Sequence, residues 1–158
     1  MRSTSEYGRA AERALGMWVK LARAFATMNR LTGEDIRRYG LTQAQFGVLE
    51  TLGHKGRMTL GDLAHRSLST GGNMTVVVHN LIRGGLVKRS VSTLDRRVVY
   101  VALTPRGTRL FRRIFPQHAA AVARIAGVLS AADQERLGDL LRTLGRGAEA
   151  RGNTLNLK

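Results

Sequence analysis

Few residues in this sequence are of the types that catalyse reactions or bind metals. The histidines are His54, His65, His79 and His118. No two of them have the short spacing of a zinc motif, and there is no cysteine to complete one. The absence of cysteine also excludes disulfides and thiol-based sensing. There is no glycine-rich phosphate loop and no nucleophile with a plausible local base. The sequence therefore predicts no metal, no cofactor and no enzymatic activity, and the histidines are interpreted as ordinary surface or core residues.

Positive charge is the strongest signal in the composition. The net charge is +15, and most of the basic residues are arginine, whose planar fork suits phosphate and guanine edges. Twelve basic residues against two acidic ones lie between His54 and Arg113. Such a concentration attracts a polyanion and releases its counterions. Nucleic acid is therefore the expected partner, and the alternative is a solvated basic face in an organism that favours arginine.

Residues 69–83 contain most of the side chains that could read DNA. Their apolar positions recur at helical spacing, so the remaining positions are expected to face solvent. Asn73 could bond an adenine edge, Val76 could touch a thymine methyl, and Thr75 could bond a base or a phosphate. Gly71 and Gly72 could let the backbone approach a phosphate, or they could allow close helix packing. The alternative for Val76 is a place in the core. The predicted DNA-binding residues here are Ser69, Thr70, Gly71, Gly72, Asn73, Thr75, Val76, His79 and Arg83.

A second group of candidates lies at Asp95, Arg96 and Arg97, in the turn of an expected β-hairpin. An arginine on a protruding loop can enter a minor groove while a neighbouring carboxylate holds it in place. The alternative is an ordinary surface ion pair. Because these residues follow the helices described above, we interpret Arg96 and Arg97 as DNA contacts and Asp95 as the anchor of the wing.

Capping patterns and apolar periodicity predict the elements that position these residues. An amphipathic helix is expected from about residue 6 to 28. Thr42 to Gln45 is a capping box that opens a second helix, and Thr59 to Asp62 opens a short third helix. Ser69 caps the fourth, which ends at Gly84 and Gly85. A hairpin over 86–103, a long helix from Pro105 kinked at Pro116, and a last helix from Ser130 follow. The predicted fold class is mainly α with a small β-hairpin wing, a winged helix-turn-helix.

Several segments together resemble the MarR family of bacterial regulators. They are Leu41 to Leu49, Gly72 to Thr75 with Val77, Val78, Asn80 and Leu81, Gly85 to Val87, Asp95 to Arg97, and Val101 to Pro105. The resemblance covers about residues 40–145, in the order and spacing of the family. It implies a recognition helix that includes Gly72, Asn73, Thr75 and Val76, with Arg97 as the wing arginine and Asp95 as its anchor. His79 stands where the family usually has aspartate, and Ile82 where it often has glutamate. The helix therefore loses two acids and gains a side chain that can become a cation near DNA.

The resemblance also implies a homodimer built from the first and last helices. The expected organisation is an N-terminal dimerisation helix at 1–35, the winged helix-turn-helix at 36–104, C-terminal dimerisation helices at 105–145 and a flexible tail at 146–158, in one compact domain. Small residues between Ala119 and Ala126 favour close helix contact. Met17 and Trp18 are candidates for a ligand pocket between the dimerisation helices and the winged helix-turn-helix at 36–104, named here the reading head, or alternatively for the dimer core.

The function predicted from these observations is sequence-specific regulation of transcription. The partners would be a pseudo-palindromic DNA operator, a second copy of the chain and a small effector, aromatic or phenolic, that releases a repressor. The alternative is a ligand-independent or non-specific architectural DNA-binding protein. With no signal peptide and no apolar span, the expected location is the cytoplasm, at the nucleoid.

Overall fold

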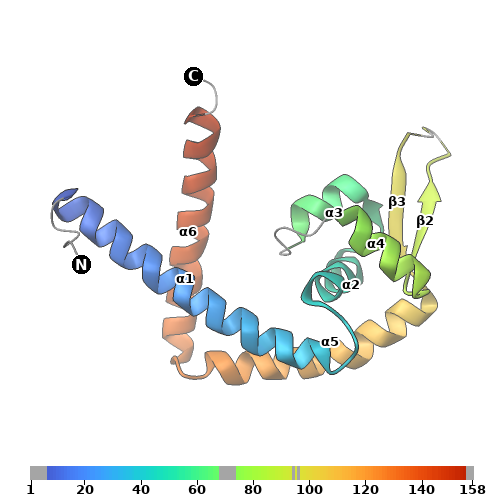
Figure 1. Cartoon of the computed structure of the whole chain (residues 1–158), viewed down its shortest axis with the longest axis horizontal. Helices are drawn as coiled ribbons and strands as arrows, with labels where there is room; N and C mark the ends of the chain where they lie inside the picture. Colours follow the sequence, from blue (N-terminus) through green and yellow to red (C-terminus); the bar gives the residue numbers. More distant parts are fainter. Residues whose placement is uncertain (1–6, 68–73, 94, 96, 156–158) are drawn as a thin grey trace. The chain divides into compact units, whose positions relative to one another are not determined.

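The computed structural model describes residues 7–67, 74–93, 95 and 97–155 (Figure 1). In this part of the chain the elements are α1 (Gly8–Arg37), α2 (Gln43–Lys55), β1 (Met58–Thr59), α3 (Leu60–Arg66), α4 (Met74–Arg83), β2 (Val87–Val91), β3 (Val99–Leu103), α5 (Pro105–Ala126) and α6 (Ala131–Leu155). The mainly helical fold with a small wing confirms the predicted fold class. None of the helices in these ranges is both long and apolar enough to cross a bilayer.

The chain divides into two units, residues 1–119 and 120–158, where the sequence predicted one compact domain. The boundary lies inside α5. The second unit consists of the end of α5 and α6. Because a helix makes most of its backbone contacts within itself, such a segment clusters separately from the winged helix.

The helix starts follow the capping patterns of the sequence. The Thr42 hydroxyl accepts from the Gln45 amide at 3.2 Å, while the Gln45 side chain accepts from the Thr42 amide at 2.9 Å, which completes the capping box. The Thr59 hydroxyl accepts from the Asp62 amide at 3.1 Å at the start of α3. Each contact satisfies an amide that has no partner within its helix.

The sheet is antiparallel with strand order β1-β3-β2. Val101 of the central strand pairs with Met58 on one side and Arg89 on the other. The β2–β3 hairpin was expected, whereas β1 was not. A strand of two residues is too short to show the alternation by which strands are recognised in a sequence.

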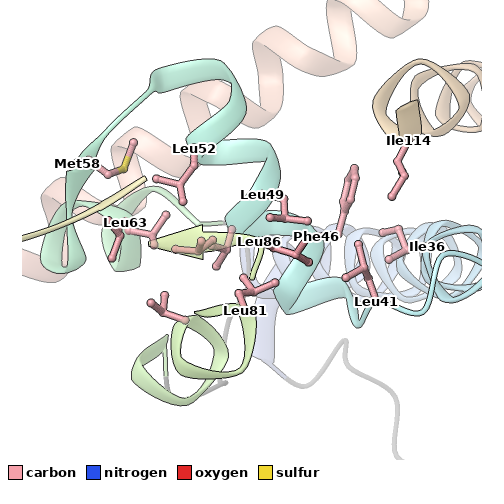
Figure 2. Close-up of a cluster of buried hydrophobic side chains, with 14 residues drawn as sticks. Ile36, Leu41, Phe46, Leu49, Leu52, Met58, Leu63, Leu81, Leu86 and Ile114 are labelled. Atoms are coloured by element: carbon pink, nitrogen blue, oxygen red, sulfur yellow. The ribbon is translucent and has the colours of Figure 1, made fainter. Parts of the chain in front are cut away.

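The core surrounds α2, as Figure 2 shows. Phe46, Val48, Leu49 and Leu52 are buried along this helix. Each fully buried side chain of this size contributes roughly 1.5–3 kcal/mol relative to an exposed one. The other elements supply the remaining core residues, among them Ile36, Leu63, Val78, Leu81, Val87, Val101 and Ile114. The reading head is therefore one packed body centred on α2.

The turn between α4 and β2 fastens the hairpin base to the start of α5. The Leu86 amide donates to Leu81 and the Gly85 amide to Ile82, with Gly85 at φ +68°, which is the Schellman way of ending a helix. The Thr104 hydroxyl then donates to the Gly85 carbonyl at 2.7 Å. A side chain at Gly107 would overlap the Leu86 carbonyl oxygen, so this close approach requires glycine.

Two helices are longer than the sequence predicted. α1 continues beyond Met28 to Arg37, where Ile36 is buried in the core. α6 continues to Leu155, so residues 146–155 are helical, and the flexible tail expected there was wrong for these residues. Single glycines were interpreted as helix ends, but each costs a helix interior only about 1 kcal/mol. No proline stops α6, and Pro116 lies inside an α5 that continues past it.

Candidate nucleic-acid interface

One side of α4 faces the core and the other faces solvent. Val78 and Leu81 are buried, and Met74 and Val77 are half-buried. The exposed residues of α4, named here the reading face, are Thr75, Val76, His79, Asn80 and Arg83. Val76 is 51% exposed, which excludes the alternative that it belongs to the core of this chain.

The reading face has the donors, acceptors and charge that a duplex requires. It combines a hydroxyl, an imidazole, a carboxamide, an apolar methyl surface and a guanidinium, and α4 has no acidic residue. These groups match the base edges and phosphates of a major groove. Asn80 was not among the predicted contacts, although it lies one turn beyond Val76 on the same side of the helix. The predicted contacts Ser69, Thr70, Gly71, Gly72 and Asn73 lie outside the described residues.

The turn between β2 and β3, named here the wing tip, is organised around Asp95. The Arg97 amide donates to Asp95 Oδ1 at 2.9 Å, and Arg97 Nε lies 3.3 Å from the same oxygen. Two hydrogen bonds lower the pKa of Asp95 below its ordinary value: the one from the Arg97 backbone amide is the larger cause, and the one from the Arg97 side chain is the smaller. Arg97 Nη2 also lies 3.5 Å from Asp95 Oδ2, and the Arg97 side chain remains 92% exposed, so the guanidinium is held by the carboxylate and is still accessible to an anion. Arg96 lies outside the described residues.

A pocket of about 310 Å³ lies between α2 and the end of α3. Its lining residues are Gly47, Glu50, Thr51, His54, Lys55 and Arg66. Three of these side chains can carry positive charge and one is a carboxylate. Met17 and Trp18 do not line it and are 46% and 61% exposed on α1. The sequence signal for this pocket was the helical spacing of residues 47, 50, 51 and 54, which places them on one side of α2.

A family model described as the MarR family matches residues 41–99. The HTH-type transcriptional regulator MhqR of Bacillus subtilis (strain 168) is 34% identical over 138 residues, covering 87% of this chain and 95% of that protein. This chain belongs to the MarR family.

Solved structures of MarR-like proteins share the fold. Sco3205 of Streptomyces coelicolor, a MarR family regulator in complex with DNA, is 25% identical with a TM-score of 0.77, over 87% of this chain and 88% of that one. BpsR of Bordetella bronchiseptica, whose DNA binding is regulated by 6-hydroxynicotinic acid, is 28% identical with a TM-score of 0.74, over 82% and 98%. The MarR chain described here is therefore a transcriptional regulator with a DNA-binding winged helix.

His118, interpreted from the sequence as an ordinary surface or core residue, lies largely buried beside a carboxylate in this MarR family member. His118 of α5 lies 3.6 Å from Asp35 of α1, between Nδ1 and Oδ2, and the two side chains are only 12% and 16% exposed. Neither of these two atoms has a hydrogen-bond partner. The Phe46 ring lies 4.6 Å from the imidazole, centroid to centroid. No sequence signal indicated this pair, because its members are 83 positions apart.

A second polar contact joins the same two regions of the MarR chain. The Tyr39 hydroxyl, just after α1, donates to the Gln117 carboxamide oxygen on α5. With the Asp35–His118 pair, this fixes the end of α1 to the middle of α5 beside the reading head. Within the described ranges no three histidine or carboxylate side chains gather as a metal site would require.

Proposed function

We propose that this protein is a homodimeric repressor that binds a pseudo-palindromic operator and is released by a small effector. The observation that carries the proposal is the exposed reading face of α4 beside a wing tip that Asp95 holds in shape. In a winged helix-turn-helix, this pair of elements reads a major groove and the groove next to it. Such a role belongs in the cytoplasm, at the nucleoid.

Exposed apolar residues support the dimer. On α1, Leu15, Met17, Trp18, Val19, Phe25 and Met28 are exposed. On α6, Leu137, Leu140, Leu141 and Leu144 are exposed. A monomer rarely leaves so many large apolar side chains in water. A second copy would cover them, and two-fold symmetry would then set two reading faces on half-sites about 10 bp apart.

Each protomer would read its half-site through α4 and grip the adjacent backbone with the wing. Val76 would contact a thymine methyl, while Thr75 and His79 would bond base edges or phosphates. Arg83 and Arg97 would contact phosphate or the minor groove. Ser69, Thr70, Gly71, Gly72, Asn73 and Arg96 stay predictions from the sequence. A repressor of this kind acts by occupying the operator, with no catalytic step.

The pocket between α2 and α3 is the proposed effector site in place of Met17 and Trp18. Lys55 and Arg66 would bind a carboxylate, and Glu50 would accept from a hydroxyl. A small aromatic or phenolic acid meets both requirements, and the related BpsR responds to a compound of that class. Arg66 is the last residue of α3, eight positions before α4 begins, so a ligand there would bias the helix that reads DNA.

The test is selection of bound duplexes from a random library, followed by binding measurements with competitor DNA. The expected result is an inverted repeat bound by two protomers, preferred about a thousandfold or more over unrelated DNA. Equal binding to all sequences would instead indicate an architectural protein that coats DNA through its charge. A monomer that ignores duplex at low salt would overturn the proposal altogether.

A further inference from the structure

Part of the positive charge lies on α5, outside the reading face and the wing tip. Arg106, Arg109, Arg112 and Arg113 are all exposed on the first turns of α5. The helical period places them on the side away from the buried residues Gly107, Phe111 and Ile114. We name these four residues the α5 arginine face. None of them makes an ion pair with any residue in the described part of the chain.

This arrangement is unfavourable for the helix itself. α5 has no acidic residue in its first turn, where negative charge would complement the helix dipole, and no acidic residue elsewhere. Arg109 repels Arg112 and Arg113, which lie three and four positions further on. Sequences that break local rules in this way tend to do so at functional sites. An anionic partner would relieve the repulsion.

The α5 arginine face is remote from the wing tip. α5 begins directly after β3, so it leaves the base of the hairpin while Asp95 and Arg97 lie at the opposite end (Figure 1). The hairpin between the two ends consists of two paired strands of five residues each. Its length is therefore about 17 Å, at 3.4 Å per residue. The α5 arginine face and the guanidinium that the wing tip presents therefore lie at opposite ends of the hairpin.

We propose that the α5 arginine face binds the phosphate backbone of a second DNA segment while α4 and the wing hold the operator. The inference rests on the proposed function. The four guanidinium groups are distributed over about 10 Å of helix, and each can bond phosphate bidentately. DNA is favoured over an acidic protein because a bound regulator is surrounded by phosphate at high effective concentration. The dimer would then bridge two duplexes.

The experiment uses a short duplex recovered by the selection above, about 24 bp long, immobilised and saturated with protein. After unbound protein is washed away, capture of a labelled 200-bp duplex of unrelated sequence is measured at 50 mM salt. The variant is R109Q/R112Q, and the matched control is R37Q/R38Q, which removes equal charge from exposed arginines at the end of α1. The wild-type protein and the control should capture the second duplex. R109Q/R112Q should capture at least tenfold less, with its affinity for the short duplex unchanged within twofold.

A thermal readout separates binding from a structural role. Removing mutual repulsion should leave Tm unchanged or raise it by about 1–2 °C, whereas R37Q/R38Q removes cations that suit a helix C-terminus and should lower it slightly. Equal capture by R109Q/R112Q would overturn the inference, and so would equal loss in both variants. Weaker binding of R109Q/R112Q to the short duplex would show that α5 contacts the operator itself. If the wild type retains the short duplex but captures no second one, this inference alone fails, whereas failure to retain the short duplex specifically rejects the proposed function with it.

Discussion

Asp95 accepts three hydrogen bonds from Arg97 at the wing tip, from its amide at 2.9 Å, its Nε at 3.3 Å and its Nη2 at 3.5 Å, so one carboxylate contacts both the turn and the arginine it presents. The Val98 amide donates back to the Asp95 carbonyl at 2.9 Å and closes the turn. The Asp95 carboxylate thus adds to the backbone hydrogen bonds of the turn the contacts that hold Arg97.

Arg97→Ala should weaken operator binding and reduce its salt dependence. If Arg97 contacts phosphate, its loss should lower the slope of log K against log salt by about one for each protomer. The measurement is a titration of the selected duplex at several salt concentrations. Arg37→Ala is the matched control, and an unchanged slope for Arg97→Ala would contradict the role given to the wing.

The Arg97 amide should report the ionisation of Asp95. Because the pKa of Asp95 is lowered in the folded protein, its contacts with Arg97 are complete above the ordinary aspartate value of about 3.9 and are lost as pH falls through the lowered value. NMR of the Arg97 amide during acidification should give a midpoint below about 3.9. Asp95→Asn should abolish this titration, and a midpoint at or above the ordinary value would refute the contact.

Gly107→Ala should destabilise the protein by about 2 kcal/mol or more, because the added methyl would overlap the Leu86 carbonyl oxygen. Gly138→Ala is the matched control, since a methyl there meets nothing within 4 Å inside α6. It should stabilise by about 0.4–1 kcal/mol. Denaturant unfolding of both variants measures the difference, and similar effects at the two positions would show that the α5 start is not tightly packed.

The Asp35–His118 pair should behave as a coupled unit. Asp35→Leu or His118→Leu alone leaves the other polar group largely buried without a partner, which costs about 1–3 kcal/mol. The double variant should lose less than the sum of the two, with a coupling energy of about 0.5–3 kcal/mol. Unfolding measurements on the four proteins complete this cycle. Strictly additive losses would mean that the 3.6 Å approach contributes nothing.

Local features were predictable from the sequence because their causes are local. The Thr42 capping box and the Thr59 cap each involve residues three positions apart, and the two sides of α4 follow from its period. Features that depend on distant residues were not predictable. β1 exists only because Met58 meets Val101, and the pocket needs Arg66 beside α2. Met17 and Trp18 were predicted to line a cleft between the dimerisation helices and the reading head, and that stays a prediction, because a site of that kind depends on elements far apart in the sequence.

The Thr104 hydroxyl donates to the Gly85 carbonyl at 2.7 Å, while its oxygen accepts from the Gly107 amide at 3.0 Å. This one hydroxyl thus connects three elements: the C-terminal end of α4, the base of the β2–β3 hairpin and the first turn of α5. A displacement of α5 would therefore act directly on the base of the hairpin. An effector that displaced the start of α5 would in this way shift Arg97 at the tip of the hairpin, without touching DNA itself.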